Sequence, residues 1–266
     1  MNFKLKSYES LKIGLLLVAF GLFVSSCDDE VHTPILTLDG GGAVVTSVMV
    51  DNAIEKMNLD LKRTSTFHAV IKNATSIGDE AFKGCTKLQS VVFPVGLQTI
   101  GEQAFYECKA LQSLPFPNGL KTIEYRAFYN SENLESVVFP DGLQTIGDQA
   151  FYNCQALQSI EFPDGLQSIG LGAFYWGSKL KSLVFPATLQ SIGPGAFLMA
   201  NIISSMTFYC IEPPSFVAHA TISFSMDASG ATITIPKGAD KQKWYNTLRN
   251  SAGLTGLSLD NIVFAE

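Results

Sequence analysis

The side chains best suited to covalent or metal chemistry are sparse in this sequence of 266 residues. It contains five cysteines and three histidines (His32, His68 and His219), and no two cysteines form a Cys-x-x-Cys pair. No histidine forms a ligand motif with a cysteine, a pair of carboxylates or a second histidine, so the ligand spacing of a zinc site is missing. A Gly-x-Ser-x-Gly elbow, which would expose a nucleophilic serine, does not occur either. The sequence therefore predicts no catalytic residue, no metal site and no cofactor.

One cysteine stands apart because of the residues that precede it. Three lysines lie within the first twelve residues, an apolar run covers 13–24, and Ser25-Ser26 leads directly to Cys27. This order is typical of an export signal, because the apolar run is too short to span a bilayer comfortably. Residues 24–27, Val-Ser-Ser-Cys, resemble a bacterial lipobox, in which the cysteine is lipidated and becomes the mature N-terminus. We predict a lipoprotein signal peptide over 1–26 and lipidation of Cys27; a plain secretory signal with an incidental cysteine is the alternative.

The residues after Cys27 bear on where the anchored protein resides. Asp28-Asp29-Glu30 resembles the surface-export tag of lipoproteins in the Bacteroidetes phylum, although a solvated linker has the same composition. Acyl chains on Cys27 would hold the protein at the membrane, since each buried methylene contributes about 0.8 kcal/mol. We expect an outer membrane lipoprotein that is exposed on the cell surface.

Acidic residues outnumber basic ones, and the formal net charge is −6 at pH 7. A chain without a basic stripe lacks the electrostatic footprint of a nucleic-acid-binding protein, so no nucleic-acid partner is predicted. Glu135 and Glu161 are the carboxylates that stand out as a pair for glycoside hydrolysis. Nothing else in the sequence supports that reaction, and we predict that the protein is not an enzyme.

These residues must be positioned by one repeating element. A unit of 23 residues recurs, and Phe-Pro opens each copy at Phe93, Phe116, Phe139, Phe162 and Phe185. Apolar residues return in the same columns, such as Ile100 and Ile123, and each column continues through the neighbouring units. A single unit cannot bury its apolar side alone, so the units stack and share one core. The fold class predicted is an α/β solenoid with 23-residue coils.

The pattern within one unit predicts the parts of a coil. Residues 157–162 alternate as a half-buried strand does, with Ile160 and Phe162 inward, and Pro163 ends the strand. Residues 143–146 indicate a second short extended piece, and residues 147–152 are interpreted as one helical turn. Cys85 and Cys108 fall in one column of adjacent coils, where two buried thiols are expected and a disulfide is the alternative.

Two outward-facing columns are candidates for binding. The first lies on the concave face, where the outward residues of the strands are serines beside a shallow apolar stripe. Its candidate ligand-binding residues are Ser113, Ser136, Val138, Ser159, Glu161 and Val184. Serine at every rung would equally suit a packed strand with nothing bound. A second column holds Tyr106, Tyr129, Tyr152 and Tyr175, with Trp176 beside it. Stacked aromatics can bind sugar rings or anchor an interface; we expect instead that each tyrosine covers its neighbour.

The repeated motif Leu-x-x-(Ile/Val)-x-Phe-Pro-x-x-Leu-x-x-Ile-Gly-x-x-Ala-Phe-x-x-Cys resembles the BspA-like, or Treponema-type, leucine-rich repeat. The resemblance implies a right-handed leucine-rich repeat array over 67–208, preceded by a linker and N-terminal cap over 27–66. Residues 209–266, with Trp244, are similar to the region that closes such arrays and are expected to form the C-terminal cap. In the N-terminal cap a helix is expected over 52–63, after a turn at Gly40–Gly42.

What the resemblance implies about function is surface adhesion and ligand binding. We predict a surface-anchored, non-catalytic module that recognises a protein or a glycan, host-derived ligands included, and that is a monomer. The alternative is a structural or scaffolding lipoprotein of the cell envelope.

Overall fold

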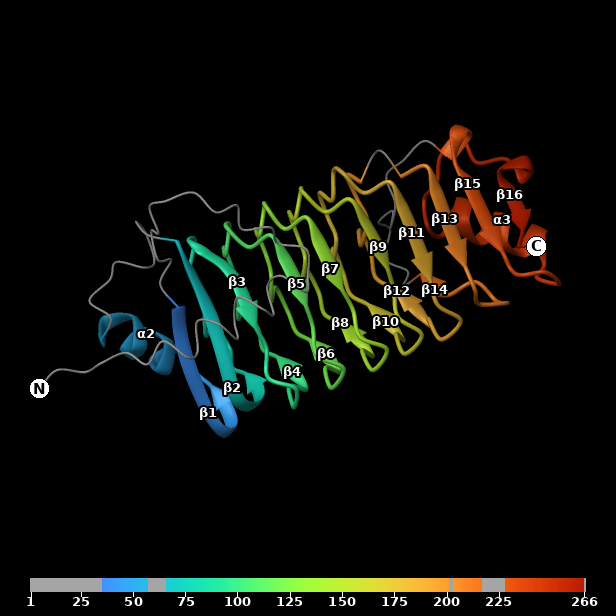
Figure 1. Cartoon of the computed structure of the whole chain (residues 1–266). Coiled ribbons are helices and arrows are strands. Elements are labelled where there is room, and N and C mark those ends of the chain that lie inside the picture. Colours follow the sequence, from blue (N-terminus) through green and yellow to red (C-terminus); the bar gives the residue numbers. More distant parts are fainter. Residues whose placement is uncertain (1–34, 57–65, 201–202, 217–227, 266) are drawn as a thin grey trace, which may run out of the picture. The chain divides into compact units, whose positions relative to one another are not determined.

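The computed structural model of the chain describes residues 35–56, 66–200, 203–216 and 228–265. These residues form a parallel β-solenoid whose coils stack one behind the next (Figure 1). Strands of neighbouring coils pair so that each residue lies opposite its equivalent in the next repeat, as Ile100 does with Ile123, and the predicted solenoid is confirmed. The predicted signal peptide and Cys27 lie outside the described residues.

One side of the coils is a continuous parallel sheet. Its strands lie in chain order, and most contribute only two residues per coil because a corner and a turn follow at once. They are β1 (Ile35–Val45), β2 (Phe67–Ile77), β4 (Thr99–Ile100), β6 (Thr122–Ile123), β8 (Thr145–Ile146), β10 (Ser168–Ile169), β12 (Ser191–Ile192) and β14 (Ser215–Phe216). The isoleucine of each short strand from β4 to β12 is buried, which places the predicted isoleucine column in the core.

The strands that lead to the Phe-Pro corners, together with their equivalents nearer the C-terminus, form a second side. We call it the interrupted row because its pairing is broken. These strands are β3 (Leu88–Val92), β5 (Ser113–Pro115), β7 (Ser136–Val138), β9 (Ser159–Glu161), β11 (Ser182–Phe185), β13 (Ser205–Phe208), β15 (Thr232–Ile235) and β16 (Ile262–Phe264). β3 pairs with β2, β5 pairs with β7, and a separate sheet runs from β9 to β16. The row is therefore divided between β3 and β5 and again between β7 and β9.

The third side, the turn side, differs from the predicted helical turn. Residues 147–152 and their equivalents form consecutive turns, and two positions per coil have positive φ. One of these columns runs Glu80, Gln103, Arg126, Gln149, Gly172, Gly195, and the other runs Gly84, Glu107, Asn130, Asn153, Trp176, Met199. A left-handed residue at these places prevents an α-helix from forming.

These left-handed residues let alternate backbone amides point at the next coil. Gln103 N donates to Tyr125 O at 2.8 Å, Phe105 N to Ala127 O at 2.7 Å, and Glu107 N to Tyr129 O at 2.8 Å. The amides between them close tight turns within the coil, as Ala104 N does to Gly101 O at 3.3 Å. The turn side thus satisfies its backbone without a helix or a β-ladder, which buried backbone groups require.

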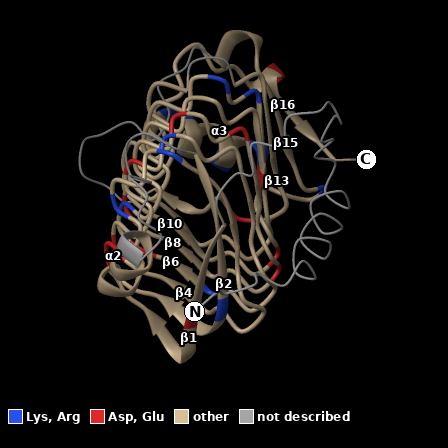
Figure 2. Ribbon diagram, turned by 60° about the vertical axis from the view of Figure 1, so that its left-hand side comes forward, with Lys and Arg blue, Asp and Glu red and all other residues tan. Residues whose placement is uncertain are grey.

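Two aromatic stacks fill the centre of the coils. The phenylalanines of the Ala-Phe motif, from Phe82 to Phe197, stack with ring centroids 4.9–5.4 Å apart. The Phe-Pro phenylalanines form a second file that starts at Phe93 and continues to Phe208, and Phe185 and Phe208 are only 4.5 Å apart. Edge contacts such as Phe139 to Phe151, at 5.7 Å and 78°, join the two files. Within the described residues no Lys, Arg, Asp or Glu is buried, and charged residues are distributed over the outside of the coils (Figure 2).

The ends of the array are irregular. At the N-terminal end Gly40–Gly42 lies within a bulged stretch of β1 instead of a separate turn, and α2 spans Ser47–Lys56. The helix predicted over 52–63 therefore begins five residues earlier, and residues 57–65 lie outside the described residues. The predicted start was wrong because Asn52 was interpreted as the residue that begins the helix, whereas it lies inside α2.

At the C-terminal end Thr232–Ile235 forms β15, and α3 spans Lys241–Asn250. Asp240 begins α3 by accepting a hydrogen bond from Lys243 N at 3.0 Å, and the Trp244 ring lies 4.7 Å from Phe208. Leu259–Asn261 forms a 3-10 turn directly before β16. None of the helices in the described ranges is long and apolar enough to cross a membrane.

Candidate functional site

The six candidate ligand-binding residues all lie on strands of the interrupted row and face away from the core. Ser113 belongs to β5, Ser136 and Val138 to β7, Ser159 and Glu161 to β9, and Val184 to β11. The residues between them, Leu114, Ile160 and Leu183, are buried. Val138 is the most exposed of the apolar candidates, with 65% of its surface accessible.

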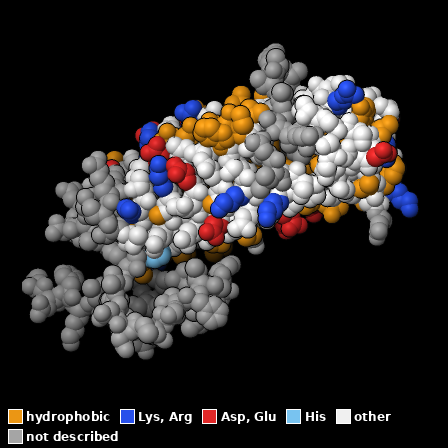
Figure 3. Space-filling model, turned by 90° about the horizontal axis from the view of Figure 1, so that it is seen from above, with side chains coloured by type: hydrophobic (Ala, Val, Ile, Leu, Met, Phe, Trp, Pro, Cys, Tyr) orange, Lys and Arg blue, Asp and Glu red, His pale blue; other side chains and the backbone are white. Residues whose placement is uncertain are grey.

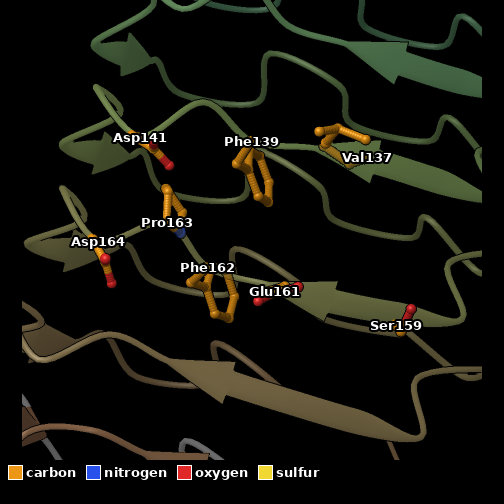
Figure 4. A pocket seen from close by; sticks show the side chains of 9 residues that line it. Val137, Phe139, Asp141, Ser159, Glu161, Phe162, Pro163 and Asp164 are labelled. Atoms are coloured by element: carbon orange, nitrogen blue, oxygen red, sulfur yellow. The ribbon is translucent and has the colours of Figure 1, made fainter.

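A cavity of about 380 Å³ brings three of these residues together. Val138, Ser159 and Glu161 line it, whereas Ser113, Ser136 and Val184 do not. The remaining lining residues are Val137, Phe139, Asp141, Phe162, Pro163 and Asp164 (Figure 4). We call this cavity the β7–β9 groove.

The groove lies where the row of strands is broken. β7 pairs with β5 and β9 pairs with β11, but β7 and β9 belong to separate sheets. Val137, at the centre of β7, is only half-buried, although its equivalents Leu114 and Ile160 are buried at 1% and 3% exposure. The broken pairing therefore opens apolar side chains of β7 to solvent at this point.

Carboxylates surround the apolar floor of the groove. Glu161 comes from β9, and Asp141 and Asp164 come from the corners that follow Phe139-Pro140 and Phe162-Pro163 (Figure 4). The lining contains no lysine, arginine or histidine. The two aspartates were not among the predicted site residues, because those were chosen from the strand columns alone. The sequence signal that could have indicated them is an acidic residue at the same corner position of two consecutive coils.

A second, more open hollow of about 550 Å³ lies near the N-terminal coils. It is lined by residues of β2 and of the first Phe-Pro corner, with Lys72 as its charged group. Val95, at its edge, is 88% exposed. None of the six predicted binding residues lies in it.

The cysteines of the described coils are buried thiols, as predicted, and Cys85 and Cys108 form no disulfide. Cys108 Sγ donates to Phe82 O at 3.2 Å, and Cys154 Sγ donates to Phe128 O at 3.4 Å. Burial raises the pKa of Cys108 and of Cys154 well above the usual thiol range, and it raises the pKa of Cys210 to about 11. Thiols held in the neutral form inside the core are poor nucleophiles.

The other candidates for chemistry do not assemble into a site in the part of the chain that the structure describes. His68 Nδ1 lies 2.6 Å from Ser90 Oγ, and burial lowers the His68 pKa. No group of three His, Cys, Asp or Glu side chains could hold a metal ion within those residues. His32 and His219 lie outside the described residues.

The tyrosine column is packed as expected, with each ring covering the next. Adjacent rings of Tyr106, Tyr129, Tyr152 and Tyr175 lie 5.0, 4.6 and 4.8 Å apart and are within 7° of parallel. Each ring covers the face of the next, so the inner rings offer no flat platform to a sugar.

On the face seen from above, hydrophobic side chains gather in a compact patch with charged residues near it (Figure 3).

A stack of near-identical 23-residue coils, with leucines at fixed positions facing the core, defines a leucine-rich-repeat solenoid. The pattern of the BspA type leucine rich repeat region matches this chain at residues 75–204 and 121–240, in six copies. The chain belongs to this family.

Solved structures of bacterial leucine-rich repeat proteins resemble the fold. The T. pallidum leucine-rich repeat protein is 28% identical, with a TM-score of 0.51, over 54% of this chain and 73% of its own. A leucine-rich cell surface protein from Faecalibacterium prausnitzii is 21% identical with a TM-score of 0.55; the match covers 76% of this chain and 63% of that protein. No curated protein matches the sequence.

Proposed function

We propose that this protein is a surface-anchored binding module that recognises a protein ligand through the β7–β9 groove. The observation that carries the proposal is the groove itself, in which exposed Val138 lines the same cavity as Glu161, Asp141 and Asp164. An apolar floor with a carboxylate rim is complementary to a peptide that carries apolar and basic side chains. A glycan is the less suitable ligand for this groove, because the aromatic rings that line it, Phe139 and Phe162, are both buried.

The protein is proposed to be non-catalytic. Repeat proteins of this kind typically use their repeated surface for recognition, and chemistry has to be argued from a site and not from the fold. In the described coils the thiols are buried and His68 is paired with Ser90, away from any carboxylate cluster.

The anchor is proposed to be a lipid on Cys27, with the array displayed on the outer membrane of a Bacteroidetes-type cell. The support comes from the sequence: an apolar run over 13–24, small residues before Cys27, and the acidic triplet after it. Metabolic labelling with palmitate should mark the protein, and Cys27→Ala should abolish the label. Label that persists in Cys27→Ala would disprove the lipid anchor, and protease added to intact cells would show which side of the membrane carries the array.

A scaffolding role in the envelope is the second candidate. It is favoured by the uniformity of the interrupted row, where serine recurs at every strand start from Ser113 to Ser205. A binding surface would be expected to vary more from coil to coil. The two roles differ in whether a soluble ligand is captured.

The test is a binding screen of the purified protein from residue 28 onward against panels of extracellular host proteins and of glycans. A ligand that uses the groove should lose at least tenfold in affinity with Val138→Asp and with Glu161→Arg. Val95→Asp, which places the same charge on an exposed valine of the other hollow, should bind normally. Unchanged binding by both groove variants would remove the groove as the site, and a screen with no ligand at all would favour the scaffold.

A further inference from the structure

The tyrosine ladder, made of Tyr106, Tyr129, Tyr152 and Tyr175, is a feature that ligand binding at the β7–β9 groove does not use. Its rings come from four successive coils at the same repeat position on the turn side. The closest pair is Tyr129 and Tyr152, with centroids 4.6 Å apart and an interplanar angle of 5°. All four tyrosines are half-buried, so the ladder is partly accessible to solvent while each ring is held by its neighbours.

The ladder has an aromatic neighbour that is open to solvent. Trp176 is 45% exposed, and its ring lies 5.7 Å from Tyr175 and 6.2 Å from Tyr152. Indole and phenol rings are the side chains most easily oxidised by one electron after the thiols. The thiols of Cys85, Cys108 and Cys154 are fully buried, which leaves tyrosines and Trp176 as the accessible electron donors of the central coils. Besides the ladder these include Tyr125, which is half-buried and lies outside the stack.

The surroundings of Tyr152 favour its protonated form before any oxidation. Burial raises the pKa of Tyr152, and the neighbouring phenols Tyr129 and Tyr175 add to the effect. Each ring oxidised at neutral pH therefore gives up an electron together with its hydroxyl proton and becomes a neutral radical. A neutral radical is compatible with the position of Arg126, whose guanidinium lies 5.1 Å from the Tyr129 ring.

We propose that the tyrosine ladder is an oxidative modification site, at which a one-electron oxidant joins the tyrosines of adjacent coils through a dityrosine bond. Two neighbouring phenols each lose one electron and one proton, and the two phenoxyl radicals combine through a carbon ortho to oxygen. The ring hydrogens then move to the oxygens and restore both aromatic rings, so the product lacks two hydrogens. The co-reactant is a peroxide with a peroxidase: the two electrons and two protons reduce one hydrogen peroxide to two waters.

Geometry favours coupling within the chain over coupling between chains. The solenoid holds the two rings about 5 Å apart before reaction, so their effective concentration far exceeds that of two separate molecules. The new bond would link two coils that are otherwise joined by hydrogen bonds and packing. A cross-link of this kind restricts the unfolded chain and should slow unfolding of the array.

The experiment treats the protein at low micromolar concentration with horseradish peroxidase and hydrogen peroxide. The wild type should give dityrosine fluorescence in the monomer fraction, an intact mass lower by two hydrogens, and a cross-linked peptide that contains Tyr129 and Tyr152. Tyr129→Phe leaves only the Tyr152–Tyr175 pair, and Tyr152→Phe leaves only the Tyr106–Tyr129 pair, so each should give less monomeric product. The double variant has no adjacent pair and should give none.

Tyr209→Phe is the matched control, because Tyr209 is 54% exposed and lies outside the ladder. It should react as the wild type does. Phenylalanine keeps the stack, and circular dichroism would check that each variant is folded. Wild-type protein that yields only cross-linked dimers, or a cross-linked peptide that lacks ladder tyrosines, would overturn the proposal whatever the variants do. None of these readouts depends on a ligand, so the outcome is independent of the proposed binding function.

Discussion

At the scale of single residues, the cysteine column shows how one atom decides whether a buried group is satisfied. Cys108 and Cys154 reach back to carbonyls of the phenylalanine column, but Ser131 occupies the same column between them. Ser131 is fully buried, and its hydroxyl has no hydrogen-bond partner. The Cβ–O bond is shorter than Cβ–S, so the hydroxyl falls short of the carbonyl that a thiol would reach. An unsatisfied buried hydroxyl costs about 1–3 kcal/mol.

We expect Ser131→Cys to raise the free energy of unfolding by about 1–2 kcal/mol, because the thiol should bond the Phe105 carbonyl as its neighbours do in their coils. Ser131→Ala should also stabilise, by a smaller amount, since it removes the unsatisfied group but leaves a small void. Urea denaturation would measure both, with the exposed Ser136→Ala as the control. A loss of stability in Ser131→Cys would contradict this account.

His68 gives the stability a pH dependence. Burial lowers its pKa below the ordinary value of 6.5, so the unfolded chain takes up the proton first as the pH falls. The contribution of His68 is therefore complete above about pH 6.5 and is lost as the pH falls toward the folded pKa. The melting temperature should fall between pH 7 and pH 5, and His68→Gln, which can still bond Ser90, should reduce that fall. An equal fall in the variant would assign the effect to other groups.

At the scale of elements, the turn side is the part of the coil for which the prediction was wrong, because a helical turn was expected there. Its two left-handed columns hold Glu, Gln, Arg, Trp and Met as well as Gly and Asn, so they carry no residue signature of positive φ. Asparagine is the side chain best suited to this conformation after glycine. In the second column Asn130 and Asn153 also bond to each other, with Nδ2 of Asn153 3.0 Å from Oδ1 of Asn130.

Glu107 precedes these asparagines in the same column, with φ 58°. Glu107→Asn should raise the free energy of unfolding by about 1 kcal/mol, because asparagine accepts the left-handed backbone and can extend the asparagine pair by one coil. Glu107→Gln removes the charge equally but has no such preference, so it serves as the control and should change stability little. Thermal and urea unfolding would compare them, and equal stabilities of the two variants would refute the backbone explanation.

Much of the coil could nevertheless be predicted from the sequence. The leucine, isoleucine and Ala-Phe columns recur once in every repeat, and burial of a side chain is what such periodicity reports. The outward orientation of Ser159 and Glu161 followed from strand alternation. The β7–β9 groove could not be predicted in this way, because the break in strand pairing depends on how neighbouring coils pack against each other. Asp141 and Asp164 occupy the same position of consecutive coils, and both line the groove at that break.

At the scale of the whole array, the two files of phenylalanine rings act as a shared core that must be covered where it ends. Trp244 does so for the Phe-Pro file: it is fully buried, it packs on Phe208, and its Nε1 donates to Ile211 O at 3.0 Å. Stability in such arrays is approximately a sum over coils and the interfaces between them, so losing an end cover exposes the next coil in turn.

Trp244→Ala should lower the free energy of unfolding by about 3–5 kcal/mol, through the loss of buried area and of the Phe208 contact. Hydrogen exchange should show the loss first in β13 and β15, next to the variant, before it reaches the central coils. Trp176→Ala changes the other tryptophan, which is 45% exposed, and should cost less than about 1 kcal/mol. Uniform loss of protection along the array would argue against an end-cover role for Trp244.

The one-way direction of the turn-side hydrogen bonds has a consequence for how such chains grow. Donors of each coil always meet acceptors of the coil that follows, at the same three positions. A duplicated gene segment that encodes one whole repeat would thus arrive with its upper and lower contacts already matched. An insert of another length within the turn side would misalign these three positions with the next coil. Lengthening by whole units is the change that evolution can make here without redesigning an interface.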